Sequence, residues 1–478
     1  MRDCIPDEAP SLTPCRDGSV SARRKRRRTM KCYELLIAGA VSVPMLFAGI
    51  CRADDDSTTI QVKLKPWGFV AMETGQIVKG GPDLENNTSV NGMWMRQFMG
   101  SMGVDALLSD RSKVSVGMEI DMFNNVPIAL GPGDASQYGN PLNWYAYLTE
   151  AEYKHRFGDV KSPWLVFEAG YFPFKYNPDA RDLGEYLFRT GTYPQYINTV
   201  FDQAFARLPG FHAALHPTSN LTIDGLFYSN MEEWYATGDW NLAAIATYTP
   251  ARGIVLGMGG SLNSIISADS NQTTPRDASD AYHITYNEAT GKSDTSFYTF
   301  KGAKVMAMAS IDLKEFFGTM GYMGYGKEDL KIFGEAAILG LKNYPSTLDT
   351  PVVSYNNILQ RIPVMAGINL PTFKLLDVLS CQAEWFGSPY PNDIGGIVNS
   401  ELPLPLSYNL TLNNFPDDHW KWAMYATKKF FKYYTLTAQV ADDHLRYTAL
   451  PTDVNIDFNE VFHNLHEWYY ILKFTAAF

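Results

Sequence analysis

The last eleven residues, Trp468-Tyr-Tyr-Ile-Leu-Lys-Phe-Thr-Ala-Ala-Phe478, alternate in character along their whole length. Successive side chains of a strand point to opposite faces, so one face would be entirely apolar or aromatic, whereas the other would carry Lys473 and Thr475. The first set is Trp468, Tyr470, Leu472, Phe474, Ala476 and Phe478. A strand with lipid on one side and an aqueous lumen on the other has this pattern. The stretch therefore predicts a transmembrane barrel strand; an edge strand of a soluble sandwich is the alternative.

This ending resembles the C-terminal signature of bacterial outer-membrane β-barrels. The resemblance implies that Trp468, Tyr470, Phe474 and Phe478 form an assembly signal that the barrel-assembly machinery reads. It also implies that the barrel sits in bacterial outer-membrane lipid as a multi-pass protein.

The same alternation recurs upstream and predicts an all-β, antiparallel up-and-down barrel of about 16 strands, an even number as in known bacterial barrels. In the third strand, Val114, Val116 and Met118 would face outward, and Glu119 and Asp121 inward. The expected strands are Ile60–Gly75, Met93–Leu108, Lys113–Met122, Trp144–Phe157, Trp164–Phe174, Leu208–His216, Leu221–Ser229, Leu242–Tyr248, Gly253–Asn263, Lys301–Leu313, Asp329–Leu341, Ile362–Leu370, Lys374–Phe386, Trp420–Thr427, Tyr433–Asp443 and Asn464–Phe478.

The connections between these strands alternate in length, as they do in outer-membrane barrels. Gly158–Pro163 and Pro217–Asn220 are short, whereas Asn124–Asn143 and Lys175–Arg207 are long. The exception is Lys314–Glu328, which is longer than the other turns at its end.

The N-terminal part does not read as part of the barrel. Residues 1–29 end in a basic run, and residues 30–53 contain an apolar segment followed by Cys51-Arg-Ala53. A charged region, an apolar region and a small residue at the cleavage point are typical of a secretory signal peptide. We therefore expect an over-extended start at 1–29, a signal peptide at 30–53 and the barrel at 54–478. A twin-arginine signal, a basic nucleic-acid-binding arm and a lipoprotein site at Cys51 are the alternatives.

The charge of the remaining chain argues against a nucleic-acid partner. Of 40 basic and 51 acidic residues, ten and five lie within residues 1–53, so the remainder has a net charge of −16. Such a chain would be repelled by phosphates. Four of the five cysteines also lie in residues 1–53. Cys381 is left alone on an expected strand, so the sequence predicts neither a disulfide framework nor a cysteine metal site.

The long segment Lys175–Arg207 carries charges of both signs together with Leu183, Tyr186, Leu187 and Phe188. In 16-stranded porins, which this chain resembles in strand count, the loop after the fifth strand folds into the lumen. The resemblance implies a pore constriction here, and opposed charges across a constriction select solutes by charge. The constriction charges would be Asp179, Arg181, Asp182, Glu185 and Arg189. A loop that covers the outer rim is the alternative.

Charged residues on the inward faces of strands would line the lumen. In the fourth strand we expect Tyr145, Tyr147 and Tyr153 to face outward. The expected lumen-lining residues are Glu119, Asp121, Glu150, Glu152, Lys154, Arg156 and Lys473, with Asp224, Glu335 and Glu384 also inward. Acidic groups dominate this set, which indicates a modest cation preference or a tolerance of neutral sugars.

No motif points to an enzyme, a cofactor or a metal. His463 and His466 are three residues apart, which would place them on opposite faces of a strand. The segments Gly334–Pro345 and Arg361–Phe373 resemble parts of outer-membrane proteins of Fibrobacter-type bacteria, which implies location and fold but no solute.

The sequence thus predicts a porin-like channel for passive diffusion of small hydrophilic solutes. Resemblance to porins of this size implies a homotrimer. The alternative function is a non-conducting surface or structural barrel whose long loops bind a polymer or a protein.

Overall fold

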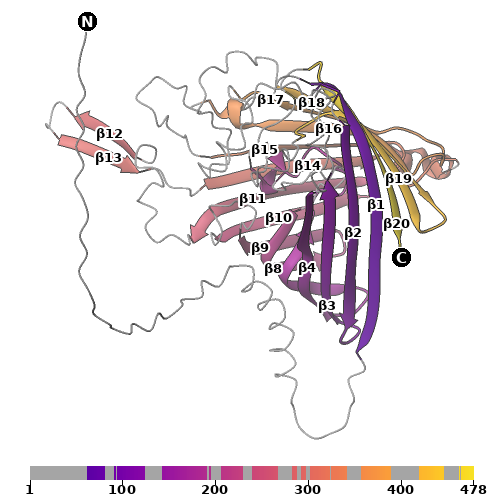
Figure 1. Ribbon diagram of the computed structural model, residues 1–478. Helices are drawn as coiled ribbons and strands as arrows, with labels where there is room; N and C mark the ends of the chain where they lie inside the picture. Colours follow the sequence, from indigo (N-terminus) through magenta and orange to yellow (C-terminus); the bar gives the residue numbers. More distant parts are fainter. Residues whose placement is uncertain are drawn as a thin grey trace, which may run out of the picture. The chain divides into compact units, whose positions relative to one another are not determined.

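The chain forms a closed antiparallel barrel of sixteen strands in the computed structural model, as the alternation predicts (Figure 1). Neighbours in the barrel follow one another along the chain, so the topology is up-and-down. The barrel strands are β1 (Lys63–Lys79), β2 (Trp94–Leu107), β3 (Ser112–Phe123), β4 (Asn143–Gly158), β5 (Pro163–Phe174), β8 (Ala206–Thr218), β9 (Leu221–Ser229), β10 (Trp240–Ala251), β11 (Ile254–Ile266), β14 (Gly302–Asp312), β15 (Lys331–Ile338), β16 (Pro363–Asn369), β17 (Val378–Phe386), β18 (Trp420–Phe430), β19 (Tyr434–Asp442) and β20 (Trp468–Ala477).

The structure describes residues 62–80, 91–92, 94–123, 143–190, 193–194, 206–229, 240–266, 282–287, 292–297, 302–322, 324–341, 357–388, 419–445, 462 and 465–478. The predicted start and signal peptide in residues 1–53 lie outside these ranges.

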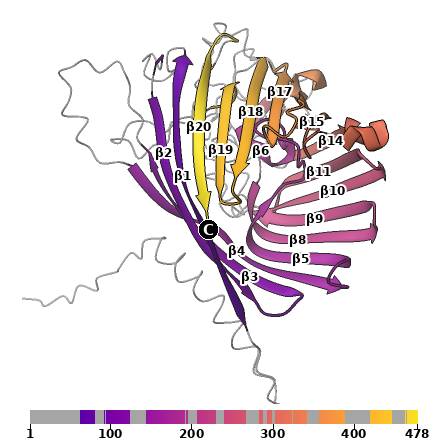
Figure 2. The same cartoon turned by 90° about the vertical axis from the view of Figure 1, so that its right-hand side faces the viewer.

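Strand β20 closes the barrel by pairing with β1 (Figure 2). Phe478 continues the ladder, because its backbone N–H donates to the Gly68 carbonyl at 2.9 Å and its carbonyl accepts from the Gly68 N–H at 3.2 Å. Tyr469, Ile471 and Lys473 are buried on the inner face, whereas Leu472 and Phe474 are exposed on the outer face. The two faces predicted from the terminal stretch are therefore confirmed.

The expected orientation of Tyr147 is wrong, and a β-bulge in β4 is the reason. Gly117 of β3 pairs with Glu150, but the next residue, Met118, pairs with Leu148, so Thr149 is the extra residue. A bulge of one residue reverses the inward and outward sets beyond it. Tyr147 therefore faces inward, beside Glu119, its partner across the ladder.

The connections are sorted by length as predicted. Residues 108–111, 159–162, 219–220, 252–253 and 431–433 make short turns at one end of the barrel. Two connections at that end are longer. Residues 370–377 join β16 to β17, and residues 313–330 contain the 3₁₀ helix η2 (Leu313–Tyr322).

Small elements that the alternation does not predict lie within the other connections. They are the 3₁₀ helices η1 (Tyr186–Phe188) and η3 (Ile358–Arg361), and the two-stranded pairs β6 (Arg189–Thr190) with β7 (Tyr193–Pro194) and β12 (Tyr282–Asn287) with β13 (Lys292–Phe297). Within the described part of the chain, no helix is both long enough and apolar enough to cross a membrane.

A candidate constriction inside the barrel

The segment after β5 crosses the barrel interior. Strand β5 is fifth in the barrel order and β17 is thirteenth of sixteen, so the two strands lie on opposite walls. The backbone N–H of Leu183 nevertheless donates to Gln382 of β17 at 3.2 Å. The hydroxyl of Tyr186 in η1 donates to Glu384 of the same strand at 2.6 Å. The segment therefore reaches from β5 through the interior to the opposite wall.

Glu335 of β15 holds this segment with a single carboxylate. Its Oε1 accepts from the Tyr176 hydroxyl at 2.6 Å and from the Tyr186 N–H at 2.9 Å. Its Oε2 accepts from the Asn177 side-chain amide at 2.9 Å and from the Glu185 N–H at 3.0 Å. Hydrogen bonds to a charged acceptor are stronger than neutral ones. We call this arrangement the Glu335 clamp.

The clamp lies on the inner face of the wall. Glu335 and Glu384 are 3% and 1% exposed, whereas their outward neighbours Ile332 and Trp385 are 43% and 37% exposed. The alternation of β15 and β17 thus places both carboxylates on the inner face of the barrel, away from the exposed apolar side chains.

Apolar side chains of the segment also pack against the strands near its start. Leu183 and Leu187 are buried. The Phe188 ring meets the rings of Phe174 of β5 and Tyr228 of β9 edge-on, with centroids 5.6 and 5.4 Å apart. Burying aromatic rings in this way contributes both area and ring-ring contact. The segment is therefore packed into a core that it shares with β5, β8–β10 and β14–β17.

Gly184 allows the segment to approach β16. Its φ is +94°, and a Cβ there would lie 2.7 Å from the Met365 methyl carbon. The backbone conformation favours glycine, whereas the close contact could be relieved by a movement of the Met365 side chain.

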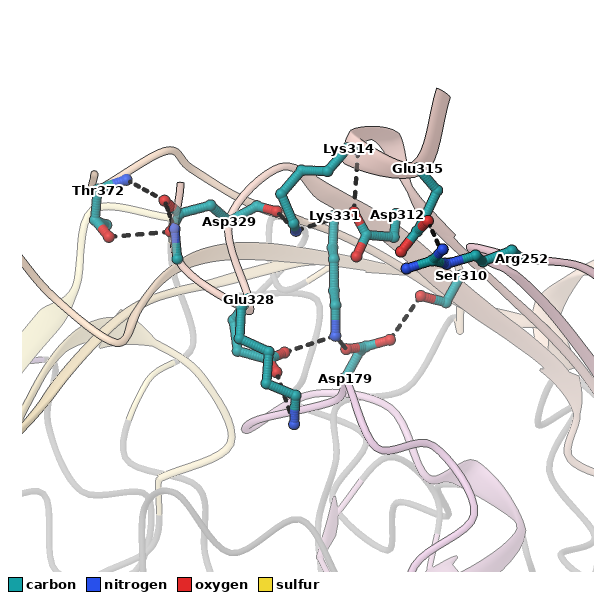
Figure 3. Close-up of polar contacts among 12 residues, drawn as sticks. Asp179, Arg252, Ser310, Asp312, Lys314, Glu315, Glu328, Asp329, Lys331 and Thr372 are labelled. Carbon is teal, nitrogen blue, oxygen red and sulfur yellow. Dashed lines mark hydrogen bonds and ion pairs between the residues drawn. The ribbon is translucent and has the colours of Figure 1, made fainter. Parts of the chain in front are cut away.

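Asp179 extends the contacts to β14 and β15 (Figure 3). Its carboxylate accepts from the Ser310 hydroxyl at 2.6 Å and pairs with Lys331 at 3.3 Å. Lys331 also pairs with Glu328 at 2.6 Å. Arg181 lies 4.0 Å from Glu328, with its guanidinium 5.8 Å from the centre of the Tyr425 ring of β18. Asp179 and Arg181, two of the predicted constriction residues, thus lie against the wall that includes β14, β15 and β18.

Of the other predicted constriction residues, Glu185 and Arg189 are buried within the segment, at 3% and 4% exposed. The Arg189 guanidinium donates to the carbonyls of Asp182 and Gly184. Its charge therefore stabilises the fold of the segment. Asp182 is half-buried, and its backbone N–H donates to Gln382 at 3.4 Å.

Glu185 sits beside the clamp. Its carboxylate accepts the backbone N–H groups of Asn177 and Tyr176 at 2.5 and 3.5 Å. Burial, reinforced by the neighbouring charge of Glu335, raises the pKa of the Glu185 carboxyl well above its ordinary value of 4.5. Desolvation disfavours the charged form of a carboxyl, and so does a second carboxylate nearby.

The wall made by β20 and β1–β4, across the barrel from the Glu335 clamp, is polar and acidic. Glu119 and Asp121 of β3 both accept the Tyr147 hydroxyl at 2.8 Å. Arg207 of β8 lies over the Tyr147 ring, 5.3 Å from its centre. Lys473 of β20 pairs across the ladder with Glu73 of β1.

The remaining predicted lumen residues lie on β4. Glu152 pairs with Lys113 at 3.4 Å, and Lys154 pairs with Glu168 of β5. Glu150 is half-buried, and Arg156 is exposed. Together with Glu119, Asp121 and Lys473, these residues lie on the inner face, but none is among the contacts of the clamp.

Sequence reasoning missed several contributors to the site. The roles of Glu335 and Glu384 as acceptors for the segment are one case. The His444 imidazole, just after β19, also hydrogen-bonds to the Glu384 carboxylate at 2.7 Å. Lys304 of β14 donates to the Arg189 carbonyl. Alternation predicts the inward direction of Glu335, Glu384 and Lys304, but no local signal identifies their partners in the segment, which lie more than a hundred residues away.

Among the described residues, no group of three or more His, Cys, Asp or Glu side chains is placed to hold an ion. His463 lies outside the described residues.

No family model matches the chain, and no curated protein matches it. Solved structures of porins do resemble it. The high-pH structure of Pseudomonas putida OprB has a TM-score of 0.45 and 9% identity, covering 87% of this chain and 94% of that chain. Salmonella typhi OmpF in complex with daunomycin gives 0.44 and 8%, covering 89% and 100%. A mutant of the Rhodopseudomonas blastica porin gives 0.41 and 7%, covering 87% and 100%. Likenesses this distant support no statement about solute or assembly, and the resemblance to Fibrobacter-type proteins stays a prediction.

Proposed function

We propose that the protein is an outer-membrane barrel that acts as a porin-like channel for passive diffusion of small hydrophilic solutes. The observation that carries the proposal is the Glu335 clamp, which fastens the segment after β5 across the lumen. A segment fixed in this way narrows the path through a barrel without closing its ends. The outward rows of exposed apolar residues on β1–β3 and β20 support a lipid setting.

The acidic wall supports a preference for cations, with neutral sugars as further solutes. Glu73, Glu119 and Asp121 outnumber Lys473 of the same wall and Arg207 of β8, which lies over the Tyr147 ring. A ring of carboxylates lowers the energy of a cation in a pore and raises that of an anion.

A specific observation favours a second function, a non-conducting surface or structural barrel. The inward side chains of the acidic wall are almost fully buried, with Glu119 at 2% and Asp121 at 0% exposed. An interior packed to this degree leaves little room for solutes along that wall, and the long connections would then carry the function by binding a polymer or a protein.

Swelling of proteoliposomes separates the two functions. The folded barrel is inserted into vesicles, which are then diluted into iso-osmotic solutions of sugars of increasing size. A porin admits small sugars, so the vesicles swell at a rate that falls with sugar size. Vesicles that contain the folded barrel and swell no faster than empty ones would contradict the channel and favour the non-conducting barrel.

A further inference from the structure

Two neighbouring turns at the short-connection end each present an exposed phenylalanine followed by a lysine. They are Phe373–Lys374, between β16 and β17, and Phe431–Lys432, between β18 and β19. Phe373 is 60% exposed and Phe431 is 87% exposed. All four residues have positive φ, at 53°, 69°, 51° and 85°. Bulky residues rarely adopt this conformation, and turns that need it usually place Asn and Gly there. We call these the Phe-Lys turns.

A buried carboxylate fixes the first turn. Asp329, which is 1% exposed, accepts the backbone N–H groups of Gly326, Thr372 and Phe373 at 2.8, 3.1 and 3.2 Å. It also accepts the Thr372 hydroxyl at 3.0 Å (Figure 3). Strained backbone persists where the surrounding structure over-determines it. The network therefore holds Phe373 and Lys374 in a conformation that their side chains disfavour.

The two turns are joined into one unit. Asp377 pairs with Lys428 at 3.6 Å and accepts the Lys429 N–H at 2.5 Å. Lys428 also donates to the Lys374 carbonyl at 2.8 Å. The phenylalanines and lysines of both turns thus keep a fixed spacing.

The unit is cationic in an acidic protein. Residues 372–377 and 428–433 contain four lysines and one acidic residue, Asp377, whereas the chain beyond residue 53 has a net charge of −16. The turns continue the outward apolar faces of their strands, on which Met424 and Leu436 are 44% and 42% exposed. Apolar groups beside lysines suit the boundary between acyl chains and anionic headgroups.

We propose that the Phe-Lys turns dock on the anionic phospholipid headgroups of the leaflet at the short-connection end. Phe431 and Phe373 enter the headgroup layer, while Lys374 and Lys432 contact the phosphates. Folding alone would favour Asn-Gly at these positions, so the presence of Phe-Lys in both turns favours a binding role. This inference rests on the membrane setting of the proposed function.

The test compares vesicles of phosphatidylcholine with vesicles that also contain phosphatidylglycerol. The expected barrel, residues 54–478, is inserted into each kind of vesicle, and the midpoint of its heat-induced shift in gel mobility is measured. We expect phosphatidylglycerol to raise the midpoint of the wild type, and high salt to reduce that gain by screening. The Lys374→Gln/Lys432→Gln variant should lose most of the gain. The matched control, Arg111→Gln/Lys161→Gln, removes two exposed cations from other turns of the same rim and should keep it.

A second variant separates binding from folding. Phe431→Asn/Lys432→Gly supplies the residues that such a turn prefers, so its midpoint in phosphatidylcholine should equal or exceed that of the wild type, while its gain from phosphatidylglycerol should fall. An equal gain in the wild type and the lysine variant, or an equal loss in the rim control, would overturn the docking surface. A barrel that enters neither vesicle would instead overturn the membrane proposal itself.

Discussion

The two halves of the barrel interior are built differently. On the side of β14–β18, carboxylates of β15 and β17 hold the segment that starts at β5. Its apolar side chains pack in a core shared with β5, β8–β10 and β14–β17. On the side of β20 and β1–β4, the wall carries Glu73, Glu119 and Asp121. Glu73 pairs across the ladder with Lys473, and the other two carboxylates meet the Tyr147 hydroxyl of β4. The first half uses its acidic groups to hold polypeptide, and the second leaves them on the wall.

The difference assigns separate tasks to carboxylates that look alike in the sequence. The two carboxylate oxygens of Glu335 accept hydrogen bonds from four donors, all of them in the segment. This carboxylate therefore stabilises the position of the segment. Glu119 and Asp121 share one hydroxyl donor, Tyr147. Substitutions in the first half should therefore change stability and pore size, and those in the second half should change ion preference.

The largest expected effect is that of Glu335→Ala. It leaves four donors of the segment without their acceptor, and each buried unsatisfied donor costs about 1–3 kcal/mol. We expect the barrel to lose at least about 3 kcal/mol of stability by this reasoning, measured by denaturant titration in detergent. The control Glu315→Ala removes an ion pair with the exposed Arg252, where a loss of about 1 kcal/mol or less is expected. Equal losses in the two variants would refute the clamp.

The next effect is a dependence of the clamp on pH. Because the pKa of Glu185 is raised in the fold, the folded state binds a proton more readily than the unfolded chain. The stabilisation is complete below the ordinary pKa of 4.5 and is lost as pH rises through the raised pKa. We expect amide hydrogen exchange at Tyr176, Asn177 and Tyr186, corrected for intrinsic rate, to be slower at acidic than at neutral pH, by about tenfold per unit of pKa shift.

Glu185→Gln provides the check on this pH dependence. Glutamine mimics the protonated carboxyl, so the variant should show slow exchange at neutral pH and little change on acidification. Exchange in Glu185→Gln that still slows on acidification would assign the dependence to another group.

A smaller effect is expected on ion preference. Glu119→Gln/Asp121→Asn removes two carboxylates from the acidic wall, so the ratio of cation to anion permeability should fall. The reversal potential in a salt gradient measures that ratio. Asp110→Asn/Asp159→Asn, in the short turns, removes the same charge from outside the lumen and should leave the ratio nearly unchanged. An equal shift in both double variants would indicate that net charge, and not the acidic wall, sets the preference.

The smallest effect belongs to Ser310→Ala. It removes one hydrogen bond to Asp179, which still pairs with Lys331. A single hydrogen bond of this kind contributes about 1 kcal/mol, and denaturant titration should give that loss. A loss as large as that of Glu335→Ala would show that the segment is held mainly at Asp179.

Much of this fold could be predicted from the sequence because barrel strands obey a local rule. Val116, Met118 and Glu119 are sorted to the correct faces by alternation alone, and all sixteen strands follow. The predicted orientation of Tyr147 is wrong because one extra residue, Thr149, reverses the alternation, and no local signal marks the bulge. The clamp could not be predicted either. Alternation places Glu335 on the inner face, but its partners Tyr176 and Tyr186 are about 150 residues away. The resemblance to porins implied only that the segment carrying these partners folds into the lumen.

Single-channel current in a planar bilayer tests the central claim most directly, with wild type and Glu335→Ala recorded side by side. If the clamped segment narrows an open pore, the wild type gives discrete steps that depend on the cation, and the variant gives larger or noisier steps of weaker selectivity. A folded, heat-resistant barrel that conducts in neither form would contradict the channel. Equal conductance in both forms would contradict the constriction.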